Sequence, residues 1–578
     1  MFKKFLKNKA GILLGILILL ILGIWAGKGL FKFEYIFTHD GDYQIARSSV
    51  AIATLKEGGF PLRWAGSMNA KCGIPIFNFF YPLIYYLESF YSLFSKNLYL
   101  GQKIIMFMSI VVSGIFFFLW AKLKTKKTLP SITGAILYLL VPYRFILVYV
   151  RGNPEYLSYA LLPLVLYLFE KTIQAKSKIP SLLFAFAASL SGALLLISHN
   201  IVAMLLMPIL LLYLAICFII EKIPLRNKLL VAAAYIGSFG LSAFFVFPAL
   251  LESKYLRLGN VMTINYKEQF PTLYQLIRSK WGYLFSNPGP NDGMSFMFGY
   301  AQWLLFGIVA IWLFVILLKY LRSRKVLEFL KKYAWELFFF IMMAVSIFLM
   351  LPQSTFVWEI VKPLQQLQFP WRLLGIGSFG ASCLSIFFLS KLDKSRFGYL
   401  ISFILIALAI VGNRNNIQAQ FFDSGTAISL DQSLESSTTT VADEILDVKA
   451  VRACSGATPF IVKESGETIN YEVGERRNLS GSARFFLPIS SGKVILGLEY
   501  FPQIYNLSVN GTDKVPYTDC EGRVCIDSGI FRDGENNITW KIGQTTTEKI
   551  FNWVTIATFV SWILAIIYLS TKREKIVK

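Results

Sequence analysis

Long apolar runs recur along the chain and are separated by short polar segments. Each run approaches the roughly 20 apolar residues that a helix needs to cross a bilayer. The first, GILLGILILLILGIWAG, follows a lysine-rich start without a clear cleavage site, which favours an uncleaved anchor. Further spans are predicted near residues 100–121, 131–150, 156–170, 181–199, 201–220, 229–250, 299–318, 335–351, 372–390, 398–412 and 551–570. The pattern predicts a mainly α-helical, polytopic membrane protein of about twelve transmembrane helices.

A second pattern divides the chain into domains. Residues 1–412 form the multi-span domain, with a first outside loop at 31–98. Residues 413–550 lose hydropathy and show short alternating runs between turn signals, which predicts a mostly β domain, a sandwich, outside the membrane. Residues 551–578 form the last helix and a basic tail. Two prolines and Glu88 interrupt the apolar stretch at 75–94, so whether it spans or re-enters the membrane stays open.

The distribution of charge gives these spans an orientation. The chain has 57 Lys and Arg against 34 Asp and Glu, a net charge of +23. The basic residues gather in alternate short loops, such as Lys122–Lys127, which predicts that these loops and both termini are cytoplasmic. The β domain is then extracytoplasmic, on a multi-pass protein of the cytoplasmic (plasma) membrane. Because the charge is spread over loops and no nucleic-acid motif occurs, we expect no nucleic-acid partner.

The first outside loop holds the most concentrated chemistry. His39 is one of two histidines in 578 residues, and it precedes Asp40 and Asp42 in the sequence HDGD. One interpretation is a capped turn before a helix, because Asp-Gly favours turns and Asp caps helices. The other is a catalytic site in which one carboxylate is a general base. A divalent cation, Mg²⁺ or Mn²⁺, stays open, with Asp40 and Asp42 as its only candidate ligands.

Further candidates stand at the outer ends of other spans. Arg144, Arg151 and Glu155 lie in PYRFILVYVRGNPE, His199 in SHN, and Arg372 in QFPWR. The structural interpretation is that the arginines snorkel at the interface, or that Arg151 pairs with Glu155. The functional interpretation is a substrate-binding clamp for phosphate, since a guanidinium matches phosphate bidentately. For the segment from Arg144 to Glu155 the two interpretations stay open. A histidine such as His199 is usually an interfacial hydrogen-bonder, although polar groups at membrane depth suggest a function.

Two smaller signals complete the candidate set. Arg63 and Trp64, in the first outside loop, are weaker substrate-binding candidates. Cys520 and Cys525, in CEGRVC, can form a disulfide in an oxidising compartment. The chain has no Walker loop, no dinucleotide-binding glycine motif and no nucleophile elbow, which argues against ATP hydrolysis and dinucleotide chemistry.

The motifs taken together suggest a family. HDGD, GFPLRWAG, NFFYP, PYR…VRGNPE, LLLISHN and QFPWRL, in this order, resemble a family of bacterial and archaeal multi-span proteins called "6-pyruvoyl-tetrahydropterin synthase-related membrane protein". That family is akin to membrane proteins that glycosylate lipoteichoic acid, and both look like the GT-C class of glycosyltransferases. The pterin chemistry in the name is not supported, because the soluble enzyme uses three zinc-binding histidines and this chain has two.

The resemblance implies an activity and roles. GT-C enzymes take a sugar from a polyprenyl-phosphate carrier and place an acidic residue in the first outside loop, here Asp40 or Asp42. It implies that one of these activates the hydroxyl of a glycan, teichoic-acid-like or protein acceptor. Two alternatives remain open, a transporter or flippase for a lipid-linked sugar and a non-enzymatic envelope assembly protein. By the resemblance, the departing lipid phosphate is bound by one of three arginines, with a histidine as helper: Arg144, Arg151 or Arg372, and His199.

Overall fold

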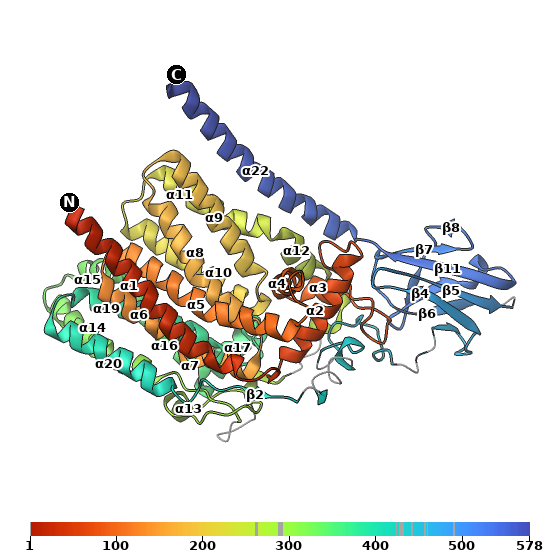
Figure 1. Cartoon of the computed structure of the whole chain (residues 1–578), viewed down its shortest axis with the longest axis horizontal. Helices are drawn as coiled ribbons and strands as arrows, with labels where there is room; N and C mark the ends of the chain where they lie inside the picture. The colour runs from red at the N-terminus through yellow and green to blue at the C-terminus, as the bar shows by residue number, and fades with distance from the viewer. Residues whose placement is uncertain are drawn as a thin grey trace.

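The structure is a computed structural model in which a bundle of helices carries a β-sheet region at one end (Figure 1). It describes residues 2–259, 264–286, 293–423, 425–426, 433–440, 443–455, 458, 460–488 and 492–577, without the side chains of 2–8, 259 and 572–577. The first helix starts, and the last helix ends, at the end of the bundle away from the sheets. We call this the terminal-side end and the opposite one the β-side end.

Nine helices in the described ranges are long and apolar enough to cross a membrane. Helix α5 begins at Asn97, whose side chain accepts a hydrogen bond from the backbone N–H of Leu100, and it packs against α1, α6 and α8. Helix α19 is almost wholly buried. The nine are α1 (Phe2–Gly27), α5 (Leu98–Thr125), α8 (Glu155–Gln174), α9 (Lys178–Leu196), α10 (Asn200–Ile220), α14 (Tyr300–Arg322), α19 (Leu374–Lys391), α20 (Arg396–Asn413) and α22 (Thr546–Val577).

Three bent helix pairs raise the number of candidate spans in the described part of the chain to twelve, in agreement with the apolar pattern. The first pair bends by 41° after α6 (Thr128–Leu139), where Pro142 starts α7 (Pro142–Phe145). A π-helical turn, η2 (Ile146–Arg151), continues it. The other pairs are α11 (Leu225–Leu241) with α12 (Ala243–Glu252), and α15 (Val326–Lys332) with α16 (Ala334–Met350), bent by 63° and 81°.

Short helices cover the β-side end of the bundle. The first loop forms α2 (Gly41–Lys56), α3 (Ile76–Phe79) and α4 (Leu83–Ser92). Residues 75–94 therefore contain two short helices rather than one continuous span, and Glu88, on α4, is fully buried. The remaining short helices are α13 (Leu273–Ile277), α17 (Thr355–Ile360), α18 (Lys362–Gln365), η1 (Lys28–Phe31), η3 (Ser253–Tyr255), η4 (Arg257–Gly259), η5 (Tyr266–Glu268), η6 (Pro352–Ser354), η7 (Pro370–Leu373) and η8 (Ser528–Ile530).

The β-sheet region contains two antiparallel sheets, as the alternating pattern predicts. One has the strand order β3-β6-β10-β9 and the other β4-β5-β11-β7-β8. Phe460 and Trp540 contact each other at 5.3 Å between ring centres, just before β3 and within β11, and so join the sheets. The strands are β3 (Ile461–Lys463), β4 (Tyr471–Arg476), β5 (Ser480–Leu487), β6 (Lys493–Glu499), β7 (Tyr505–Val509), β8 (Thr512–Asp513), β9 (Thr518–Cys520), β10 (Arg523–Asp527) and β11 (Gly534–Ile542).

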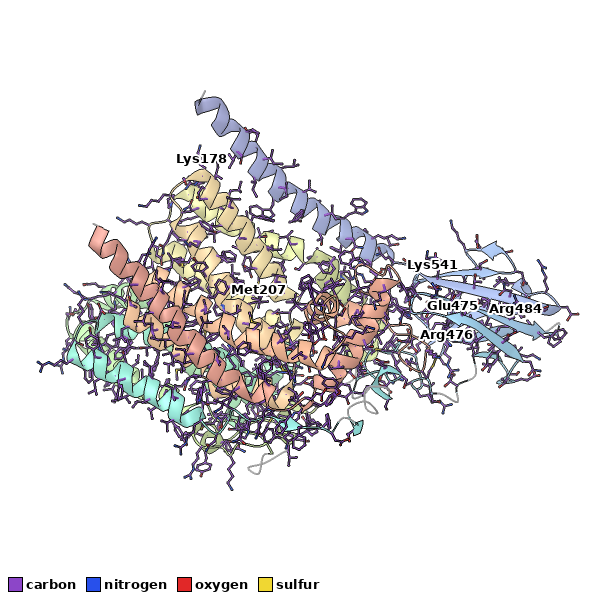
Figure 2. All side chains as sticks on the ribbon, in the orientation of Figure 1. Lys178, Met207, Glu475, Arg476, Arg484 and Lys541 are labelled. Atoms are coloured by element: carbon purple, nitrogen blue, oxygen red, sulfur yellow. A yellow bond between two sulfur atoms is a disulfide. The ribbon has the colours of Figure 1, made fainter. Side chains whose placement is uncertain are left out.

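The β-sheet region is tied to the bundle by covalent and polar contacts. A disulfide joins Cys72 of the first loop to Cys454, 382 residues later, and a second joins Cys520 to Cys525. A two-stranded ladder pairs β1 (Ile36–Phe37) with β2 (Gln420–Phe421). In Figure 2 charged side chains such as Glu475 and Lys541 project from the sheets, whereas Met207 lies among the helices and is 3% exposed.

Candidate functional site

The HDGD segment lies directly against the turn that ends η2. The backbone N–H groups of His39 and Asp40 donate to the carbonyls of Val150 and Arg151, both at 2.8 Å. Gly152 has φ of +62°, and a Cβ there would stand 2.1 Å from the Thr38 hydroxyl. Glycine is therefore required both by the left-handed conformation and by the close approach of the two segments. This contact brings together two motifs that are about 110 residues apart.

The carboxylate of Asp40 is held by two donors at this junction. Its Oδ2 accepts from Arg151 Nη2 at 3.2 Å and from Asn153 Nδ2 at 3.0 Å. The Asp40 side chain is 29% exposed, whereas that of Arg151 is 8% exposed. The structural interpretation expects the Asp40 side chain to cap α2, but it makes no capping hydrogen bond, because its carboxylate is turned towards Arg151 and Asn153. The result is an oriented carboxylate with access to solvent.

A second ion pair is buried beside it. Arg372 Nε donates to Glu155 Oε1 at 2.9 Å, and the Tyr143 hydroxyl donates to Glu155 Oε2 at 3.0 Å. The Arg372 and Glu155 side chains are 5% and 0% exposed. The pairing of Arg151 with Glu155 considered from the sequence is wrong in its partners, since each arginine pairs with a different acid. The packing of the bundle brings Arg372, 217 residues away in the chain, against Glu155 and turns Arg151 towards Asp40.

The buried arginines keep hydrogen-bond donors without partners. Within the described residues, Nε of Arg151 and both Nε and Nη1 of Arg144 have none. The Arg151 guanidinium lies 5.1 Å from the Trp371 ring centre, and that of Arg144 lies 5.1 Å from the Tyr138 ring centre. Leaving a buried donor unpaired costs about 1–3 kcal/mol. Cationic donors that stay unpaired at this cost suit an anionic ligand.

The two histidines lie in different surroundings. His39 Nε2 donates to the Tyr283 carbonyl at 2.8 Å, and the ring stacks on Phe285 at 4.3 Å. Burial lowers the pKa of His39, which therefore favours the neutral ring. His199 instead caps α10 and stacks on Tyr81 at 4.5 Å. Among the described residues, no hydrogen bond or ring contact joins His39 to His199.

Asp42 differs from Asp40 in its exposure. It lies in the first turn of α2, is 6% exposed and accepts from the Tyr99 hydroxyl at 3.5 Å. The described residues contain no group of three or more His, Cys, Asp or Glu side chains that could hold a metal ion. The Asp40 oxygen is also occupied by a cationic and an amide donor. This donor set does not fit Mg²⁺ or Mn²⁺, which prefer several oxygen ligands.

Arg63 and Trp64 belong to another cluster. Arg63 Nη2 donates to Asn552 at 3.0 Å and Nη1 donates to Asn78, while Trp64 packs edge-on to Tyr505 at 5.6 Å. Within the described contacts, neither touches Asp40 or its arginine partner. The sequence interpretation missed this cluster, although two acids flanking spans at the same end were a signal for it. Its other members are Glu252, Thr545 and Glu548, which are hydrogen-bonded to Asn78 or to each other.

Comparison with known proteins adds little. No family model matches the chain, and no curated protein matches it. Among solved structures it is similar to the oligosaccharyltransferase of Archaeoglobus fulgidus, described as a complex with Zn and sulfate, at 15% identity and a TM-score of 0.41. The match covers 70% of this chain and 54% of that one, so the chain spans about half the length of that protein. A likeness at this TM-score does not establish a common fold.

Proposed function

We propose that the protein is a GT-C-type membrane glycosyltransferase that moves a sugar from a polyprenyl-phosphate carrier to an envelope acceptor. The observation that carries the proposal is a solvent-accessible carboxylate, Asp40, oriented by the buried Arg151, which keeps an unpaired donor. Such a transfer needs a base for the acceptor hydroxyl and cations for the departing phosphate. Both groups are present within one cluster at the β-side end.

Each residue of this cluster takes one role in the reaction. Asp40 accepts the proton of the acceptor hydroxyl as that oxygen attacks the anomeric carbon of the sugar. The bond from that carbon to the phosphate oxygen breaks, and the electron pair leaves with the lipid phosphate. The spare N–H groups of Arg151 and Arg144 stabilise the charge of this phosphate. Glu155 positions Arg372 and neutralises the charge of its guanidinium.

The orientation of the chain supports an extracytoplasmic reaction. Both disulfides lie at the β-side end, and disulfides persist in oxidising compartments. The lysine-rich loops, such as Lys122–Lys127, lie at the terminal-side end, where the positive-inside rule places the cytoplasm. We therefore propose that both termini are cytoplasmic, and that the site and the β-sheet region are on the outer face of the cytoplasmic membrane.

A turnover assay on the purified, full-length protein tests the proposal. Polyprenyl-phosphate glucose, galactose and mannose, each radiolabelled in the sugar, are offered with membrane-extracted acceptors. We expect wild-type protein to transfer one of the sugars and Asp40→Asn to lose at least about 100-fold of the rate, the usual contribution of a general base. Retention of labelled lipid by Asp40→Asn should stay unchanged, because the arginines remain.

The matched control is Glu34→Gln, which neutralises an exposed acid of the same loop. It should retain full turnover. Full turnover in Asp40→Asn, under conditions where wild type and control are active, contradicts the assignment of the base. Lack of turnover by the wild type with every donor, while the lipid is still retained, contradicts the transferase itself.

The bent helix pairs favour a second candidate, a transporter for a lipid-linked sugar. Discontinuous helices are typical of transporters, and the pairs bend by 41° to 81°. The bend after α6 also leads into the segment that carries Arg144 and Arg151. A transporter would move intact labelled lipid across a proteoliposome membrane without releasing polyprenyl phosphate, whereas the proposed transferase releases it.

A further inference from the structure

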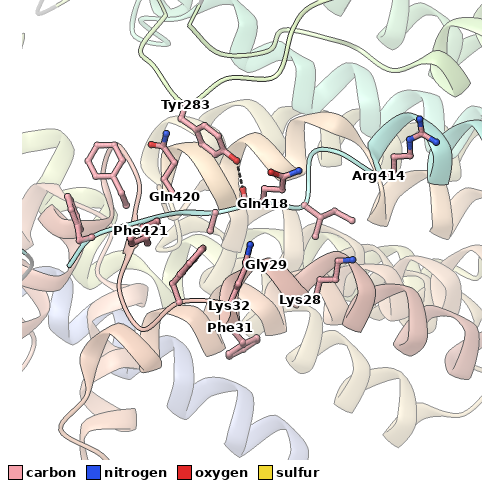
Figure 3. Close-up of a pocket in the computed structure, with 14 residues that line it drawn as sticks. Lys28, Gly29, Phe31, Lys32, Tyr283, Arg414, Gln418, Gln420 and Phe421 are labelled. Atoms are coloured by element: carbon pink, nitrogen blue, oxygen red, sulfur yellow. Dashed lines mark hydrogen bonds between the residues drawn. The ribbon is translucent and has the colours of Figure 1, made fainter. Parts of the chain in front are cut away.

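A cleft of about 1160 Å³ opens at the β-side end of the first helix (Figure 3). Its walls come from η1 and the residues after it, from the segment that follows α20, and from Tyr283. The Tyr283 hydroxyl closes one side by donating to the Gln418 carbonyl at 3.0 Å. The floor is tight at Gly29, where a Cβ would stand 2.9 Å from the Ile417 carbonyl oxygen. None of these residues contacts the Asp40 carboxylate in the described structure.

The charge of the cleft has one sign. Lys28, Lys32 and Arg414 line it, and the lining includes neither aspartate nor glutamate. None of the three forms an ion pair with a described residue. Three unpaired cations around one hollow attract an anion and can each donate to its oxygens.

Aromatic rings line the cleft beside these cations, and Lys32 Nζ lies 5.1 Å from the Phe33 ring centre. Phe33 stacks on Phe421 at 4.5 Å, and Phe37 meets Phe422 edge-on at 4.9 Å. Phe421 is 60% exposed. An aromatic wall next to a cationic one fits a ligand with an apolar part and an anionic part, because aromatic rings favour the membrane–water interface.

The surface of α1 leads into this cleft. Leu13, Leu17, Ile21 and Ile24 are 67%, 54%, 57% and 60% exposed, and their spacing places them on one face of the helix. Lys28 continues the same face by one further turn. A hydrocarbon chain lying along this face would therefore end with its headgroup at the cations.

We infer that this cleft binds the phosphate headgroup of an anionic membrane lipid, with the lipid chain against the exposed face of α1. Three cations around one hollow attract such a headgroup and can donate to its phosphate oxygens. Snorkelling alone accounts for a lysine at a helix end, but not for three unpaired cations around one hollow without an acid. The inference does not depend on the proposed transferase activity, since it uses other residues.

Lipid binding to the full-length protein in detergent tests the inference by native mass spectrometry. The probes are phosphatidylglycerol, zwitterionic phosphatidylcholine, glycerol phosphate and inorganic phosphate. We expect one phosphatidylglycerol to bind at least tenfold more tightly than each of the other three. The triple variant Lys28→Gln, Lys32→Gln, Arg414→Gln should lose this preference by about tenfold or more.

Two further variants make the outcome decisive. Lys56→Gln, Lys96→Gln, Lys254→Gln removes three exposed charges elsewhere and should bind like wild type. Lys28→Arg, Lys32→Arg, Arg414→Lys keeps the charge and should also retain binding, which separates loss of the site from loss of the fold. Equal losses in both glutamine variants overturn the site. Equal binding of inorganic phosphate or phosphatidylcholine overturns the lipid headgroup as its ligand.

Discussion

The two ends of the helix bundle bury similar charges but use them differently. At the terminal-side end, Lys124 Nζ donates to Glu170 at 3.0 Å and also to Glu221, and lies 4.6 Å from the Trp335 ring centre. At the β-side end, Arg151 pairs with Asp40 and lies over Trp371. Each end also has one fully buried glutamate, Glu170 or Glu155, and one partly exposed acid, Glu221 or Asp40.

The two ends differ in the hydrogen-bond donors that remain without a partner. A lysine has three N–H donors, and Lys124 directs them at Glu170, Glu221 and the Cys217 sulfur, at 3.5 Å for the last. Arg151 and Arg144 keep three donors without partners in the described structure. A saturated cation fixes helices together, whereas an unsaturated one has room for a ligand. We therefore interpret the terminal-side cluster as structural and the β-side cluster as functional.

The largest expected effect is a loss of stability at the terminal-side end. Glu170→Gln leaves Lys124 with one partly exposed acid, and breaking a buried pair costs about 3–5 kcal/mol. We expect a markedly lower Tm in detergent but an unchanged rate per folded molecule. Glu328→Gln, an exposed acid on α15, is the control and should melt like wild type. If folded Glu170→Gln loses sugar transfer, the terminal-side cluster is not purely structural.

The β-side end should depend on a covalent tie that the terminal side lacks in the described chain. Cys72→Ser opens a link across 382 residues, and loss of a disulfide costs about 2–4 kcal/mol. We expect easier proteolysis of the β-sheet region under non-reducing conditions. Cys520→Ser opens a link across only 5 residues and should cost less. If the two variants are equally sensitive, the longer link does not hold the region in place.

A smaller effect is expected from exchanging the type of cation at Arg151 and at Lys124. Arg151→Lys keeps the charge but removes the planar fork that matches a phosphate. We expect transfer to fall about 10- to 100-fold, or about 1.4–2.7 kcal/mol, with little change in Tm. Lys124→Arg is the matched exchange at the other end and should leave the rate unchanged. A normal rate for Arg151→Lys would show that charge alone is enough there.

The sequence could predict the spans and most candidate residues, but not their partners. Apolar runs of about 20 residues are a local signal, and so is a polar cluster at the end of a run. The pairing of Asp40 with Arg151, or of Cys72 with Cys454, depends on packing between segments far apart in the chain. Arg63, a weaker candidate from the first outside loop, contacts Asn78 and Asn552 instead of the Asp40 cluster.

The smallest expected effect concerns a carboxyl group where the β-sheet region meets the first loop. Glu499 accepts from the backbone N–H of Asp447 at 2.9 Å and from Asn69 Nδ2 at 3.2 Å. Burial nevertheless raises the pKa of Glu499 to about 8 and that of Asp447 to about 6. The backbone N–H of Asp447 favours the ionised carboxylate and so opposes the effect of burial on the pKa of Glu499.

The sign of the pH dependence follows from these pKa values. The folded state holds protons that the unfolded chain, with carboxyl pKa values of about 4, has already released. The contribution of these two carboxyl groups to the free energy of unfolding is therefore fully present below about pH 4 and is lost as the pH rises towards 8. Proteolysis of the β-sheet region should be slower at pH 5 than at pH 8.5, with a protease active at both. Glu499→Gln should flatten this dependence, because an amide keeps its hydrogens at every pH. The contrary result would be a β-sheet region of the wild type that becomes more resistant to proteolysis as the pH rises. It would mean that the two N–H donors outweigh burial and that the Glu499 carboxyl is ionised in the folded protein.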